Sequence, residues 1–302
     1  MSTDHSPPTS FSRPNEELPQ IHEAEGAPTW LVRAEHFIVA ITQVRPGAKL
    51  SRNDNRDEYM LLLPPGIEAT VECGGEARKA EGHSLSIVPP GASSIIAHAA
   101  GAVVRIFTIC EADLAAASSN AALYAPIEGK TGTDEDRPLH PIDRQFRNYS
   151  LGTLDAEGEQ LIQPRIYRST NLMVNVFWPF RWPRPTNEMR PHVHADFDQA
   201  SVALRGRWTH HVRTPWGADM NRWQDDLHVA LDSPSVIVIP AGLIHTSRNL
   251  DADAWLTDVF GPPRRDFAHA GIVLNGAEYP DDRPRDDARA HNVPAAWQKR
   301  PG

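Results

Sequence analysis

Three side chains in the second half of the chain have the types and the spacing of a metal site. The stretch RPHVHADFDQ places His192 and His194 on either side of one valine, and Gln199 ends it. In the later stretch PAGLIHTSRN, His245 follows a Pro-Ala-Gly turn. Alternate residues of a strand face the same side, so His192 and His194 can bind one ion together while a histidine on a facing strand adds a third ligand. We predict that His192, His194 and His245 hold one divalent metal ion.

Both segments resemble the paired motifs of the cupin superfamily, G(x5)HxH(x3,4)E(x6)G and G(x5)PxG(x2)H(x3)N. Residues 240–249 match the second motif at every named position after its first glycine, and the first motif matches at His192, His194 and Gly206. The resemblance covers about residues 25–262. It implies a bicupin, which is an all-β chain with two cupin domains in tandem, each a jelly-roll β-barrel, joined by a short helical or loop linker.

The sequence departs from these motifs in ways that affect the fourth ligand. Thr186 and Pro234 replace the leading glycines, and Gln199 stands where the family usually has glutamate. Asp198 is the alternative, since a gap of three residues is also tolerated, but the spacing to Gly206 favours Gln199. The residues that would share the cavity face are Ser201, Ala203 and Arg205 in the first case, and Ala200, Val202 and Leu204 in the second.

Short apolar runs interrupted by proline and glycine indicate strands rather than long helices. The chain has 27 prolines and 19 glycines, residues that end strands and form turns. Strand-like segments recur in two sets of similar order. The first set is residues 36–44, 58–63, 67–73, 84–88 and 102–109, and the second is residues 171–180, 200–206, 208–213, 235–240 and 254–260. Between the sets, residues 111–125 suit a short helix.

Two similar domains joined by a connector are the simplest account of this repeat. We predict an N-terminal arm that is disordered or draped over the fold, a degenerate cupin, a linker, a metal-binding cupin and a C-terminal tail. Their expected boundaries are residues 1–24, 25–115, 116–165, 166–265 and 266–302. Both ends are rich in proline and charge, which is why we separate them from the two domains.

The first domain keeps the turn of the second motif but not the ligands. Alignment places Arg52, Asp54 and Tyr59 at the ligand positions of the first motif, and Pro89, Gly91 and Ser94 in the second, with the serine replacing histidine. None of these sets suits a metal ion. Glu58 and His98 are isolated polar residues, for which we expect ordinary solvated or capping roles. The first domain is therefore expected to supply packing, a dimer surface or a lid.

Other polar residues of the second domain are candidates for catalysis. His210 and His211 are neighbours on one predicted strand, so one faces each side, and we name His211 as the candidate acid or base. Arg205, Arg207 and Arg213 share the strand parity of Gln199. Any of them can clamp a carboxylate through a two-pronged guanidinium, and we name Arg205 as the candidate.

The ligand set predicts the charge of the substrate. Three neutral imidazoles and an amide add no negative charge, so the ion keeps nearly its full +2 and favours an anionic, chelating substrate. Imidazoles suit iron, nickel, manganese, zinc or copper. The resemblance to cupins makes Fe(II) the leading choice and implies a non-haem dioxygenase that cleaves a carbon–carbon bond in an aromatic acid or a diketone.

Two further functions stay open from the sequence. The first is a metal-dependent isomerase, lyase or hydrolase acting on a sugar acid or keto acid, in which a redox-silent ion polarises a carbonyl. The second is a cupin that binds a small molecule without catalysis. Turnover without oxygen would favour the first, and an output domain would favour the second.

Composition restricts the partners. A net charge of −9 argues against nucleic acid, because binding phosphates requires a surplus of basic residues. No apolar run reaches the length of a membrane span, and the first residues do not have the pattern of a secretory signal. With two cysteines and no disulfide framework, we expect a cytoplasmic protein. The resemblance to bicupins also implies a homo-oligomer.

Overall fold

In the computed structural model, residues 8–124, 143–152, 165–214, 216–217 and 219–281 are described. Two sheets dominate the N-terminal half. The seven-stranded sheet has the order β12 (Arg147–Ser150), β9 (Ser84–Val88), β6 (Tyr59–Leu63), β11 (Gly101–Thr108), β4 (Phe37–Val44), β3 (Pro28–Arg33) and β2 (Ile21–His22). The four-stranded sheet has the order β5 (Lys49–Asn55), β10 (Gly91–Ala97), β7 (Ala69–Cys73) and β8 (Glu76–Ala80).

Two further sheets form the C-terminal half. The six-stranded sheet has the order β1 (Ser10–Ser12), β18 (Ser235–Ile239), β15 (Asp198–Arg205), β20 (Trp255–Gly261), β14 (Met173–Val176) and β13 (Ile166–Arg168). The three-stranded sheet has the order β17 (Leu227–Asp232), β16 (Arg207–Val212) and β19 (His245–Asn249). All neighbouring strands within these sheets are antiparallel, and each of the ten predicted segments contains a strand. The all-β prediction is confirmed.

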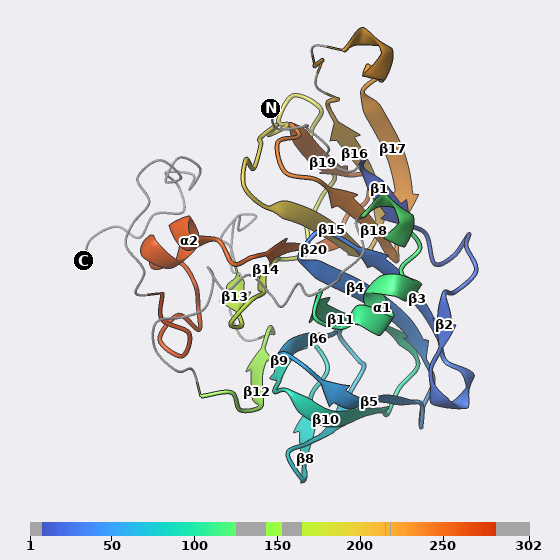
Figure 1. The fold of residues 1–302 in the computed structure, drawn as a ribbon, viewed down its shortest axis with the longest axis vertical. Coiled ribbons are helices and arrows are strands. Elements are labelled where there is room, and N and C mark those ends of the chain that lie inside the picture. The colour runs from blue at the N-terminus through green and yellow to red at the C-terminus, as the bar shows by residue number, and fades with distance from the viewer. Residues whose placement is uncertain (1–7, 125–142, 153–164, 215, 218, 282–302) are drawn as a thin grey trace.

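The two largest sheets pack against each other in the middle of the molecule. Figure 1 shows the three-stranded sheet at the top, the four-stranded sheet at the bottom and the larger sheets between them. Met60 and Leu62 of the seven-stranded sheet belong to the same buried cluster as Val202 and Val259 of the six-stranded sheet. The opposite faces of these sheets line the interior of their own halves. Burial on both faces explains why their strands are continuous apolar runs rather than alternating ones.

Among the described residues, helices are few and short. The predicted helical segment contains α1 (Ala112–Ala117) and the 3-10 turn η2 (Ala121–Leu123), and the other described helical elements are η1 (Ala24–Gly26), η4 (Met220–Arg222) and α2 (Arg265–His269). In the described parts of the chain, no helix has the length and apolar character that crossing a membrane requires.

Segments outside the two expected domains join their sheets. β1, from the N-terminal arm, pairs with β18, so residues 10–12 lie against the half of the chain that contains the histidine motifs. β12, from the expected linker, extends the seven-stranded sheet next to β9. Within the expected arm, linker and tail, residues 1–7, 125–142, 153–164 and 282–302 lie outside the described residues. The domain boundaries themselves stay predictions.

Candidate metal centre

The fold brings the three histidines together through a short backbone ladder. His192 and His245 form an isolated antiparallel bridge, in which each amide donates to the other residue's carbonyl oxygen at 3.0 and 2.9 Å. The amide of Gly242 donates to the carbonyl oxygen of His194 at 2.6 Å. The positive φ of Gly242, +84°, is a conformation that glycine adopts without strain. The Pro-Ala-Gly turn therefore joins the two histidine motifs directly.

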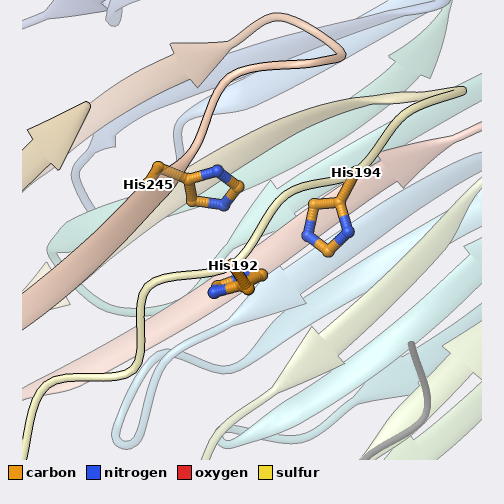
Figure 2. Close-up of side chains that lie close together, drawn as sticks. All are labelled: His192, His194 and His245. Atoms are coloured by element: carbon orange, nitrogen blue, oxygen red, sulfur yellow. The ribbon is translucent and has the colours of Figure 1, made fainter. Parts of the chain in front are cut away.

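The three imidazoles surround one point. Their ring centroids are 4.4 to 5.3 Å apart, and one donor nitrogen from each lies within 4.8 Å of the others. Figure 2 shows the rings facing a common space, with His245 on the opposite side from the His192–His194 segment. Burial lowers the pKa of His194 to about 2 and that of His245 to about 4. Both rings are therefore neutral at pH 7, the form that binds a metal ion.

The hydrogen bonds of these rings leave one nitrogen of each for a metal. Nδ1 of His192 and Nδ1 of His245 donate to the carbonyl oxygens of Arg190 and Leu243 at 3.0 and 2.9 Å, which leaves Nε2 with its lone pair. Nδ1 of His194 and Nε2 of His245 are buried without a hydrogen-bond partner among the described residues. Such unpaired imidazole nitrogens at one point fit a divalent metal ion.

Gln199, not Asp198, lies beside the three histidines. Its Oε1 accepts a hydrogen bond from Nε2 of His194 at 3.0 Å. The carboxylate of Asp198 points to the other side, where it accepts from the amides of Glu35 and Ala241, both at 2.9 Å. The residue that its spacing to Gly206 favoured, Gln199, is thus the one beside the histidines, and its role as a fourth ligand stays a prediction. In this structure Gln199 holds the ring of His194.

The three histidines open into a pocket of about 240 Å³. Most of its wall is aromatic or aliphatic, from Phe177, Phe180, Trp208, Leu256, Phe260 and Phe267. Trp208, one of the tryptophans clustered in the second half, is 2% exposed, and its ring meets that of Phe180 edge to face at 5.5 Å. A buried aromatic wall beside a metal site suits a substrate with a planar apolar body.

The pocket contains arginines that the sequence did not single out. Arg184, Arg190 and Arg264 line it. Arg264 is bound in two places to Asp266, whereas Arg184 donates to the carbonyl oxygen of Ser247 at 2.7 Å and forms no ion pair with a described residue. Arg190 is exposed, whereas Arg184 is half-buried, so Arg184 is the cation of this pocket best placed to receive an anion away from water.

None of the predicted arginine clamps lies in the pocket. Arg205 is exposed and donates to the carbonyl oxygen of Asp253 at 2.6 Å, because a register shift between Ala203 and Arg205 ends the regular alternation of β15. The other two expected clamps form surface ion pairs instead: Arg207 with Asp251, and Arg213 with Asp226. The geometry does not favour Arg205 as a catalytic residue.

His211 also faces away from the pocket. Its Nδ1 lies 2.8 Å from Nδ1 of His228 on the neighbouring strand β17. Alternation along β16 turns His210 inward instead, where it is 1% exposed and Nδ1 bonds to Oγ of Ser247 at 2.8 Å. Neither histidine lines the pocket, so the geometry does not favour the predicted acid–base role of His211.

Asn175 and Asp258 are pocket residues that the sequence reading missed. Each is a polar residue inside a largely apolar segment, in NLMVNVF and AWLTDVF, and each lines the pocket. A polar residue at such a position is a usable signal, because burying a polar group without a hydrogen-bond partner is unfavourable. Arg184 lies in a proline-rich loop and has no comparable signal.

In the first domain, Arg52 and Ser94, at aligned motif positions, form polar contacts with other side chains. Arg52 forms ion pairs with Glu111 and Asp113 at 2.5 and 2.7 Å. Ser94 donates to Glu72 at 2.5 Å. Across the described residues, the histidine trio of the second half is the one group of three or more histidine, cysteine or acidic side chains whose donor atoms are close enough for one ion.

Comparisons with known proteins identify the fold. No protein-family model and no curated protein matches the sequence. Protein Ylba from E. coli superposes with a TM-score of 0.55 at 10% identity, covering 86% of this chain and 93% of its own. Oxalate decarboxylase from Lactobacillus farciminis, solved with formate, gives 0.51 at 14% identity and 84% and 86% coverage. An oxalate decarboxylase variant from Bacillus subtilis gives 0.54 at 13% identity and 95% and 87% coverage. The chain therefore has the bicupin fold, two cupin barrels in tandem, as its histidine motifs indicated.

Proposed function

We propose that the chain is a metal-dependent enzyme that acts on an anionic, metal-chelating substrate with an aromatic or similarly planar body. The observation that carries this proposal is a trio of neutral histidines, His192, His194 and His245, at the end of a largely apolar pocket. No acidic side chain belongs to the trio, so a bound divalent ion keeps most of its charge and attracts an anion.

The size of the pocket supports an aromatic body. An apolar cavity of about 150 Å³ binds benzene, so about 240 Å³ accommodates one substituted ring. Phe180, Phe260 and Trp208 present ring faces and edges to such a body. A two-carbon diacid such as oxalate would leave this apolar wall uncovered, which is why we do not transfer the activity named for the structural neighbours.

The reaction we propose is oxidative cleavage of a carbon–carbon bond. When bound by the trio, iron(II) supplies oxygen activation. His192 and His245 present Nε2, and Gln199 fixes the ring of His194. Arg184 orients the anionic end, and the aromatic wall excludes water from the ring.

Oxygen uptake tests this reaction. Protein loaded with iron(II) without oxygen is mixed with aerated catechols, hydroxybenzoates and 1,3-diketones, and dissolved oxygen is followed. We expect one compound to consume oxygen at one equivalent per molecule cleaved, and zinc-loaded protein to be the inactive control. Turnover of a substrate by zinc-loaded protein without oxygen would refute the dioxygenase.

A second candidate function is supported by Asp258. Burial raises the pKa of this pocket carboxyl to about 7, so it can give or take a proton at neutral pH. A metal ion together with such a group suits an isomerase or lyase that acts on a keto acid. The same experiment separates the two candidates, because this reaction proceeds with a redox-silent ion and consumes no oxygen.

Arg184→Gln is predicted to weaken anion binding. A hydrogen bond to a charged group contributes about 1.5–3 kcal/mol, so the Kd of salicylate for zinc-loaded protein should rise by about 10–100-fold. Isothermal titration calorimetry measures the change. Arg207→Gln is the matched control, since Arg207 is a surface residue paired with Asp251 outside the pocket. Equal affinities in the two variants would exclude Arg184 from anion binding.

A further inference from the structure

Three polar side chains lie in one row across the pocket wall. Asn175 on β14 and Ser201 on β15 each pair in register with Asp258, which lies between them on β20. Residues paired in this way have Cβ atoms about 5 Å apart on the same face of the sheet. All three line the pocket, and we call Asn175, Asp258 and Ser201 the polar row.

The polar row lies between two apolar residues of β20, one same-face pair along the sheet from the pair of Gln199 and Phe260. On the side of the metal centre, Phe260 pairs with Gln199, whose side chain bonds to His194. On the other side, Leu256 pairs with Ala203. A ligand that extends from the metal centre along β20 therefore meets the polar row between Phe260 and Leu256.

Hydrogen bonding within the row is incomplete. Ser201 Oγ donates to Oδ1 of Asp258 at 2.6 Å and accepts from Nε2 of Gln199 at 3.0 Å. Asn175 is 2% exposed, and its Oδ1 has no hydrogen-bond partner among the described residues. A buried acceptor without a donor destabilises the protein. A ligand that donates a hydrogen bond to this acceptor therefore gains binding free energy from the bond that the protein lacks.

We propose that the polar row binds a hydroxyl group of the substrate, separate from the anionic end that chelates the metal. This inference rests on the proposed function and adds a second polar group to its substrate class. A hydroxyl can donate to the free Oδ1 of Asn175 and accept from the protonated carboxyl of Asp258, because a protonated carboxyl has one O–H donor. An ammonium fits less well, because Arg184, Arg190 and Arg264 line the same pocket.

Binding of matched compounds tests the polar row. Zinc-loaded protein is titrated calorimetrically with salicylate and with its 4- and 5-hydroxy derivatives, which chelate through the same carboxylate and 2-hydroxyl and differ in one hydroxyl. We expect at least one derivative to bind about tenfold more tightly than salicylate. Asn175→Leu should remove this preference and leave the Kd of salicylate within about twofold. Asn187→Leu, at an exposed site outside the pocket, should retain the preference.

Thermal stability gives an independent test. Leucine has nearly the shape of asparagine and removes the unpaired acceptor, so the melting temperature of ligand-free Asn175→Leu should rise by about 2–4 °C. A structural asparagine would give a lower melting temperature, and that result would overturn the proposal. An unchanged preference in Asn175→Leu and in Asp258→Asn would overturn it as well.

Failure of the proposed function gives a different result. In that case salicylate binds wild-type protein and His192→Ala with equal affinity, which shows that the metal ion takes no part in binding salicylate. The melting temperature of Asn175→Leu still decides whether Asn175 serves a ligand site or the fold.

Discussion

His192→Ala and His245→Ala are each expected to lose the metal ion and all measurable turnover. Each ring supplies one of three nitrogen donors within 4.8 Å of one another, and no described acidic side chain is placed to substitute for it. Loss of a group that merely orients a ligand lowers metal affinity by about 10–100-fold. Loss of a ligand itself should therefore lower metal affinity by more than about 100-fold.

Elemental analysis of protein purified without oxygen measures this loss. Wild-type protein should contain about one metal ion per chain, and the variants close to none. His98→Ala is the matched control, because His98 is an exposed histidine of the first domain that bonds to Thr70. A full complement of metal in either His192→Ala or His245→Ala would overturn the ligand assignment.

The sequence predicted the three histidines because their spacing is set by local geometry. Residues two apart on extended chain share a side, and the turn at Gly242 fixes the distance to His245. The spacing from Gln199 to Gly206 also favoured Gln199 over Asp198. These features depend on spacing along the chain, which a single sequence contains.

Features that depend on strand ends and on distant segments were not predicted. The alternation that would turn Arg205 inward is lost at the register shift near the end of β15. Arg184 reaches the pocket through a loop whose path depends on β19, to which it is bonded at Ser247. No local pattern reports either effect, because each arises from packing between segments far apart in the sequence.

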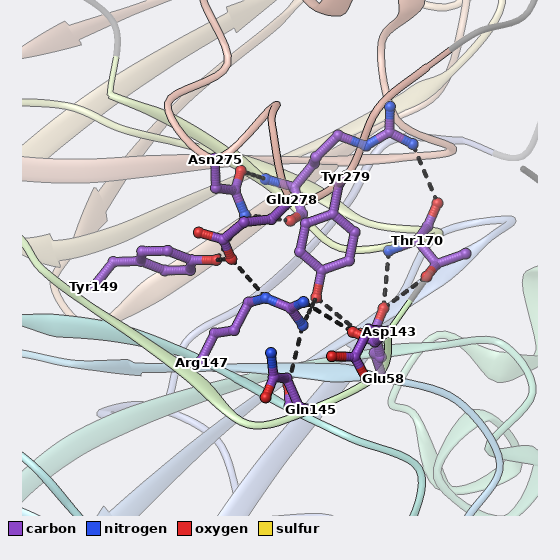
Figure 3. Close-up of polar contacts among 10 residues, drawn as sticks. Glu58, Asp143, Gln145, Arg147, Tyr149, Thr170, Asn275, Glu278 and Tyr279 are labelled. Atoms are coloured by element: carbon purple, nitrogen blue, oxygen red, sulfur yellow. Dashed lines mark hydrogen bonds and ion pairs between the residues drawn. The ribbon is translucent and has the colours of Figure 1, made fainter. Parts of the chain in front are cut away.

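Glu58 is the clearest case of a residue whose environment differs from expectation. It was expected to be solvated or to cap an element, but it is 1% exposed and lies between the two halves of the chain. Its carboxylate accepts from the amide and the hydroxyl of Thr170 at 2.9 and 2.7 Å, and from the hydroxyl of Tyr279 at 2.8 Å. Figure 3 shows these bonds continuing through Arg147 to Glu278. One carboxylate thus joins the first domain, the second domain and the C-terminal segment.

Glu58→Ala is therefore predicted to lower the free energy of unfolding by about 3–5 kcal/mol, because three buried donors lose their acceptor at once. Guanidinium unfolding followed by tryptophan fluorescence measures the change. Glu58→Gln should recover part of the loss, since its amide oxygen still accepts from Thr170. Glu68→Ala, the matched control, removes an exposed carboxylate paired with Lys79 and should cost less than about 1 kcal/mol. If Glu58→Ala were no less stable than this control, the carboxylate would not hold the two halves together.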